Sequence, residues 1–223
     1  MFKSILKLIG LFIVLSSFCS CSESIDKGLG KGLKITTELF GEESIDHYPK
    51  YVSDFNTRFH FQQRPTNKSR GSDDFFCPSE AMFFTRYKDS NYKSIKKAYA
   101  SFQTWRASDT SLIYIFPYTE DYKTLTEPHA SQINPLVYEY VEVNKPQNAI
   151  PVPLIDIKGY YDMEHVDVKG FKHILLDSKA GKPDFDIHLY DAPWLPEKWK
   201  HGYSKGISFH DEMNVVVYWF IAW

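Results

Sequence analysis

The run Val215-Val-Val-Tyr-Trp-Phe-Ile-Ala-Trp223 decides the fold class of this chain. It is apolar throughout and lacks the alternation of apolar and polar residues that is typical of a strand with one wet face. A strand that is covered on both faces has this kind of sequence. We therefore expect 215–223 to be a central strand of a sheet with protein on both sides.

Further strands are expected upstream of this run. Residues 51–62 alternate between apolar and polar side chains, which predicts a half-buried antiparallel strand. Shorter apolar runs bounded by proline or polar residues predict additional strands at 81–87, 112–116, 136–143, 155–163, 166–176 and 187–190. The sequence thus indicates an α+β fold that is mainly antiparallel β and sandwich-like, with one or two packed helices.

One segment has helical spacing instead. Its apolar residues recur every three or four positions between Ile95 and Trp105, which predicts an amphipathic helix over 94–106 with Ser94 as its N-cap. Lys96 and Lys97 are expected to face solvent. A second, shorter helix is expected within 120–132.

The first twenty-one residues resemble the signal of a bacterial lipoprotein. A short apolar stretch follows Lys3 and Lys7, and the small residue Ser20 directly precedes Cys21. This resemblance implies cleavage before Cys21 and acylation of that cysteine. Because several acyl chains give a stable anchor, the mature protein would be tethered to a membrane. An ordinary secretory signal is the alternative, and Cys19 is the less suitable lipidation site because bulky Phe18 precedes it.

The resemblance also divides the chain into three parts. Residues 1–20 are expected to be the signal peptide, 21–33 the lipidated cysteine with a Gly-rich flexible tether, and 34–223 a single β-rich domain. Ser22 follows Cys21 where an Asp would favour retention in the inner membrane. In a Gram-negative cell the pattern therefore implies an outer-membrane lipoprotein that faces the periplasm.

Composition limits the function. The chain has 26 basic and 28 acidic residues, and removal of 1–20 takes away two lysines, which leaves a formal charge of −4. This balance argues against nucleic-acid binding, which usually needs a basic stripe. Cys77 would be the one thiol left after removal of the signal and acylation of Cys21, so no disulfide can form within the domain. We expect Cys77 to be buried; the alternative is a reactive thiol assisted by His60 or His129.

The sequence offers few catalytic patterns. It contains no Gly-x-Ser-x-Gly, His-Glu-x-x-His or Cys-x-x-Cys motif. Asp184, Asp186 and His188 would share one face of a strand and could supply three metal ligands, without a fourth partner. The polar groups 162–167 and 210–212 are interpreted as hairpin turns. No cofactor is expected, and we do not expect an enzyme.

An aromatic loop over 190–203 is the remaining candidate site. Its prolines predict a loop, and it carries Trp194, Trp199 and Tyr203. Exposed rings of this kind bind proteins or stack on sugars; the alternative is that they pack over an edge of the core.

These observations lead to one functional hypothesis and two alternatives. The hypothesis is a membrane-anchored periplasmic lipoprotein that binds a protein, for example an inhibitor or immunity protein directed against a toxin or hydrolase. The first alternative is a lipoprotein that binds a glycan or small ligand through the 190–203 rings. The second is an envelope hydrolase that uses a carboxylate and histidine site.

Overall fold

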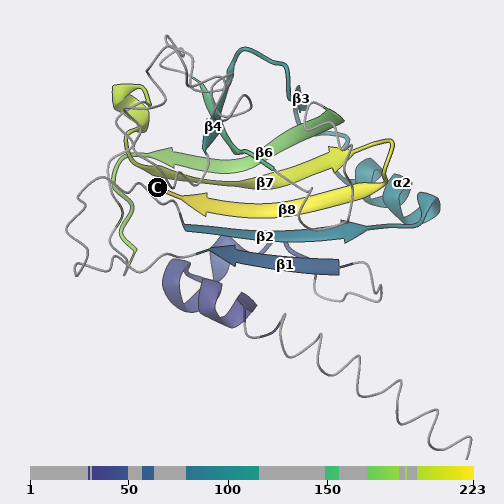
Figure 1. The fold of residues 1–223 in the computed structure, drawn as a ribbon, viewed down its shortest axis with the longest axis horizontal. Helices are drawn as coiled ribbons and strands as arrows, with labels where there is room; N and C mark the ends of the chain where they lie inside the picture. Colours follow the sequence, from purple (N-terminus) through teal and green to yellow (C-terminus); the bar gives the residue numbers. More distant parts are fainter. Residues whose placement is uncertain are drawn as a thin grey trace, which may run out of the picture.

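A computed structural model describes residues 30, 32–49, 57–62, 79–115, 149–155, 170–185, 189 and 195–223. Its main feature is a six-stranded antiparallel sheet in the order β1-β2-β8-β7-β6-β3 (Figure 1). In chain order the strands are β1 (Thr57–Gln62), β2 (Ser79–Arg86), β3 (Trp105–Arg106), β6 (Phe171–Ala180), β7 (Gly202–His210) and β8 (Val215–Ala222). The predicted fold class, α+β and mainly antiparallel β, is therefore confirmed.

Strand β8 is the central strand that the sequence predicts. It lies between β2 and β7, and all eight of its residues are buried. Alternate side chains enter different apolar clusters on the two faces of the sheet, as their period of two requires. One face receives Val215, Val217, Trp219, Ile221 and Trp223, and the other receives Val216, Tyr218, Phe220 and Ala222.

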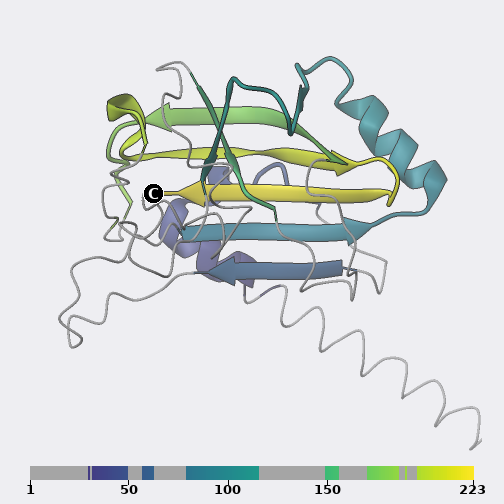
Figure 2. The ribbon, with the colours of Figure 1, turned by 45° about the horizontal axis from the view of Figure 1, so that its top comes forward.

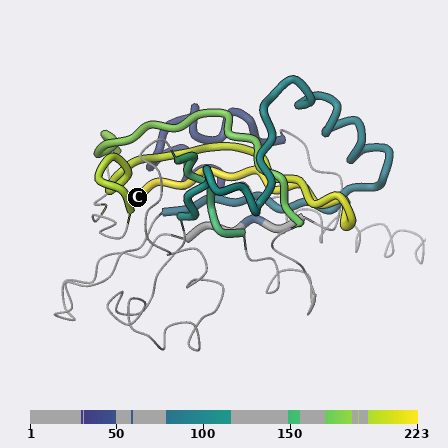
Figure 3. Tube along the Cα trace, turned by 90° about the horizontal axis from the view of Figure 1, so that it is seen from above, coloured from purple at the N-terminus to yellow at the C-terminus, as the bar shows by residue number. Residues whose placement is uncertain are grey.

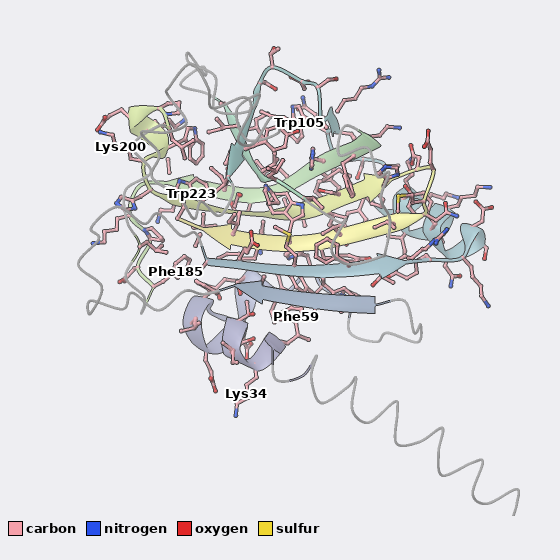
Figure 4. The ribbon with its side chains drawn as sticks, viewed as in Figure 1. Lys34, Phe59, Trp105, Phe185, Lys200 and Trp223 are labelled. Atoms are coloured by element: carbon pink, nitrogen blue, oxygen red, sulfur yellow. The ribbon has the colours of Figure 1, made fainter. Side chains whose placement is uncertain are left out.

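A small two-stranded parallel sheet covers the first of these faces, which we call the front face. It consists of β4 (Leu112–Ile115) and β5 (Ile150–Pro153), and both strands contribute to the same apolar cluster as Trp219 (Figure 2). Figure 4 shows Trp105 and Trp223 toward opposite ends of this face. The sequence predicts β4, but β5 was missed because its two prolines argue against a strand.

The opposite, back face is covered by two separate pieces of the chain. The first is the N-terminal segment, residues 32–48, in which a helix over 32–40 is followed by η1 (Glu42–Ser44). The second is helix α2 (Asp89–Ala98). Both pack against the apolar cluster that contains Phe83 and Val216, and Figure 3 shows both on the side of the sheet away from β4 and β5.

Helix α2 corrects the predicted helix over 94–106. It begins five residues earlier, because Asp89 suits the positive end of the helix and also pairs with Lys93 one turn later. Its N-cap is Lys88, so Ser94 lies inside the helix. The helix ends at Ala98, and residues 105–106 form β3, which pairs with the start of β6.

Other predicted elements are confirmed in part. The strand expected over 81–87 is β2, the strand over 51–62 is β1 in its described half, and the strand over 166–176 becomes β6 from residue 171 onward. The helix over 32–40 begins within the last residues of the predicted tether. The segments 120–132, 136–143, 156–163 and most of 187–190 lie outside the described residues.

Candidate functional site

The described part of the 190–203 loop packs onto the body of the protein. Trp199, in η4 (Glu197–Trp199), is 5% exposed, its ring lies 6.0 Å from that of Trp223, and its carbonyl accepts a hydrogen bond from the Trp223 indole. Figure 4 shows Trp223 and Lys200 at this end of the sheet. Trp199 is thus part of the core and presents no exposed ring for stacking, while Trp194 lies outside the described residues.

Tyr203 also packs, although part of it is exposed. Its ring stacks on Phe220 at 6.0 Å and lies 5.9 Å from Phe185, and its hydroxyl donates to Asp177. Phe220 therefore covers one face of the Tyr203 ring. Two of the three rings suggested by the sequence are therefore engaged within the protein.

The proposed metal set cannot be assembled from the described residues. Asp184 is exposed, whereas Asp186 and His188 lie outside the described ranges. Within those ranges no group of three or more His, Cys, Asp or Glu side chains is placed to hold a metal ion. The acidic stretch 162–167 and both Cys21 and Cys77 also lie outside the described residues.

The turn at 210–212 contains Asp211, whose carboxylate accepts hydrogen bonds from three different side chains. Asp211 accepts hydrogen bonds from Tyr92 at 2.7 Å and from the ammonium groups of Lys96 and Lys172. Burial raises the pKa of Asp211, but the hydrogen bonds from Lys172, Lys96 and Tyr92 outweigh burial and hold the pKa well below its ordinary value. Asp211 therefore joins helix α2 to β6 and to the β7–β8 hairpin.

This arrangement changes the interpretation of the turn. The sequence predicts a solvated hairpin end, and the turn does close β7 and β8, with Asn214 at a φ of 53 that asparagine tolerates. Lys96, expected in solvent, is instead half-exposed and bonded to Asp211. A helix that docks on the hairpin was not visible in the sequence, because the partners are separated by more than a hundred residues.

A buried polar group lies on the front face of the sheet. The Ser208 hydroxyl is 2.8 Å from Nδ1 of His173 and accepts a hydrogen bond from the Trp219 indole at 2.9 Å. All three side chains are buried, and burial lowers the pKa of His173 to about 3, so its imidazole is neutral at physiological pH. A serine beside a histidine can serve as a nucleophile, but a buried pair shielded by Trp219 fixes strand register instead.

Sequence reasoning missed this group for an identifiable reason. Ser208 and His173 are directly opposite each other in the β6–β7 pairing, and Trp219 reaches them across Gly206 from β8. No spacing along the chain reveals such a cross-strand contact. The sequence signal that could have revealed this face is the alternation of small residues along β7, at Gly202, Ser204, Gly206 and Ser208.

A second set of polar contacts holds the N-terminal segment against the back face. Lys205 donates to the Glu43 carbonyl and to Asp46, and Nε2 of His47 is 3.2 Å from the Trp219 carbonyl. Burial lowers the pKa of His47 to about 4, and nearby Lys205 lowers it as well. This histidine is therefore neutral at pH 7 and can donate one hydrogen bond to the sheet.

The outer side of helix α2 is the most distinctive exposed feature. Phe102, in the turn after the helix, is 44% exposed, and Lys88, Lys93 and Lys97 are exposed around the helix. The combination of ordered cations and one exposed ring is chemically suited to contact another molecule. It offers no nucleophile or metal ligand set within the described residues.

Comparison with known proteins adds no family. No protein-family model, no curated protein and no solved structure matches this chain. In the described ranges, no helix is both long and apolar enough to cross a membrane.

Proposed function

We propose that this protein is a lipid-anchored, periplasm-facing binding module whose ligand is another protein. The first twenty-one residues carry the anchoring part of this proposal, because a basic start, a short apolar stretch and Ser20-Cys21 resemble a lipoprotein signal. Acylation of Cys21 would tie the domain to the outer membrane through a short tether. An inhibitor or immunity protein that captures a toxin or hydrolase is the specific role we favour.

The exposed surface of helix α2 supports the binding part. A sheet with core on both faces is a rigid support, and Asp211 holds the helix against it through Lys96 and Tyr92. Interfaces that are organised before binding lose less conformational freedom when the partner arrives. Phe102 projects from this rigid support and is partly exposed.

The anchor is tested by metabolic labelling with palmitate. Wild-type protein should incorporate the label, Cys21→Ala should lose it, and Cys19→Ala should retain it. Labelling of the Cys21→Ala variant would disprove lipidation at Cys21. Fractionation of the same cells should place the labelled protein in the outer membrane.

The binding function is tested by chemical cross-linking in intact cells, followed by purification of the full lipidated protein. We expect a discrete protein partner, present in amounts comparable with the bait and absent from the Cys21→Ala strain if anchoring is required for the encounter. Recovery of the lipoprotein alone under several cross-linkers would refute a protein-binding role.

A further inference from the structure

Helix α2 and the residues bonded to it form a cationic surface, which we call the α2 surface. It contains five lysines and two aspartates, an excess of three positive charges on a chain whose formal net charge is −2. The lysines are Lys88, Lys93, Lys96, Lys97 and Lys172, and the aspartates are Asp89 and Asp211. Arg106, opposite Lys172 in the β3–β6 pairing, and Glu212, next to Asp211, add one charge of each sign at its margin.

Both aspartates are already used within the surface. Asp89 accepts a hydrogen bond from Lys93 at 2.7 Å, and Asp211 pairs with Lys96 and Lys172. Lys88 and Lys97 are exposed and have no acidic partner within the described ranges. Among the described residues these two lysines thus carry unpaired positive charge, while Lys93, Lys96 and Lys172 are held by their ion pairs.

An aromatic side chain lies at the C-terminal end of the same helix. Phe102 is 44% exposed, and its ring lies 5.9 Å from that of Tyr99, which in turn packs 6.4 Å from Phe209. The ring is thus supported from below and open to solvent above. Aromatic side chains are enriched in the buried centre of protein interfaces, whereas charged residues belong mainly to the polar rim.

We infer that the α2 surface binds a protein whose contacting surface is acidic. This inference rests on the proposed function, since it assigns a location and a charge to the protein partner required there. Opposite charges steer the encounter and exclude partners of the wrong sign, and Phe102 would supply the buried apolar contact.

An anionic lipid surface is the other class of partner with suitable charge. The acidic side chains that the back face also exposes argue against binding to a lipid surface. The N-terminal segment covers part of the same face, and it exposes Glu38, Glu42, Glu43 and Asp46. A flat anionic bilayer that touched α2 would also approach these carboxylates. A protein of limited footprint can contact the lysines and avoid the acids.

Site-specific photo-cross-linking in cells tests the location. A benzoylphenylalanine at position 102 of the full lipidated chain should cross-link to one protein with an acidic surface. The Lys88→Glu, Lys97→Glu double variant should lose the product. The control is Lys34→Glu, Lys179→Glu, which makes the same charge change at two exposed positions elsewhere; Figure 4 shows Lys34 pointing away from the sheet.

The purified protein provides a second test with defined probes. Poly-L-glutamate should bind with an affinity that falls as salt is added, and the Lys88→Glu, Lys97→Glu variant should bind about tenfold more weakly. The control double variant should bind like the wild type. Equal binding by all three proteins would overturn the inference, as would binding to phosphatidylglycerol vesicles without binding to poly-L-glutamate.

The outcomes in cells separate this inference from the function on which it rests. A second chain can carry the benzoylphenylalanine at position 179. Protein cross-links from position 179 but not from position 102 would overturn the assignment of binding to the α2 surface and leave a protein-binding function in place. Cross-links from 102 to lipid alone would also overturn it. The absence of protein cross-links from every position would remove the proposed function together with the inference.

Discussion

Of the two glycines in β7, Gly206 should be the one at which replacement by alanine destabilises the protein more. A Cβ at this position would lie 2.2 Å from the Ile174 carbonyl oxygen and 2.4 Å from the Trp219 ring. Neither neighbour can yield easily. The carbonyl belongs to the β6 backbone that pairs with β7, and the indole is held by its hydrogen bond to Ser208.

The expected cost has two parts. Overpacking in a filled core costs about 1–3 kcal/mol. Displacement of the indole breaks its bond to Ser208 and leaves a buried N–H group unpaired, which costs about 1–3 kcal/mol more. We expect a loss of about 2–6 kcal/mol, which for a chain of this length lowers the melting temperature by about 4–24 °C.

Urea unfolding followed by tryptophan fluorescence measures the loss, and near-ultraviolet circular dichroism reports the Trp219 environment. Ser204→Ala is the matched control, because Ser204 lies two residues away on the same face and its buried hydroxyl has no hydrogen-bond partner in the described part of the chain. This variant should be neutral or slightly more stable. A Gly206→Ala protein within about 1 kcal/mol of wild type, with an unchanged dichroism spectrum, would refute the close packing of Trp219 on Gly206.

Three further predictions concern the polar groups and the aromatic loop. First, His47 and His173 have folded pKa values of about 4 and about 3, below the ordinary 6.5, so the native state binds fewer protons than the unfolded state, and stability should fall as pH drops from 6.5 toward 4. Equilibrium unfolding at several pH values should show a shallower dependence for His47→Gln. Second, Asp211→Asn should cost about 1 kcal/mol, since its ion pairs are partly exposed, and should speed amide hydrogen exchange in α2 while β8 stays protected. Third, Trp199→Ala should cost about 3–5 kcal/mol in unfolding measurements, as a core truncation does, and a normal stability would show that the ring is not buried.

The sequence predicted the parts of the fold that depend on local pattern. Unbroken apolar character identified β8, and apolar runs identified β2 and β4, because a strand that is buried on both faces is apolar at every position. The sequence placed helix α2 too late in the chain because the N-terminal turn of the helix is polar. Only Tyr92 in that turn is buried in the core. β5 was missed because it contains two prolines, which ordinarily mark a loop. The parallel pairing of β5 with β4 nevertheless accommodates both of them.

The candidate sites were harder to predict, since they depend on contacts between distant segments. Trp199 was expected in a loop, and it does lie next to prolines, but its burial against Trp223 depends on where β8 ends. The bonds of Asp211 join segments that are 39, 115 and 119 residues apart. No rule of spacing along the chain links such residues.

The central place of β8 has a consequence for biogenesis. β8 separates β2 from β7, so the strands synthesised earlier cannot be joined into one sheet until residues 215–222 are present. This order of strands delays completion of the sheet until the end of synthesis. The β1–β2 hairpin would wait with an open edge, which is the period in which such edges attract other chains. Chaperones that shield exposed strand edges would therefore act on this protein before β8 is synthesised, and not afterwards.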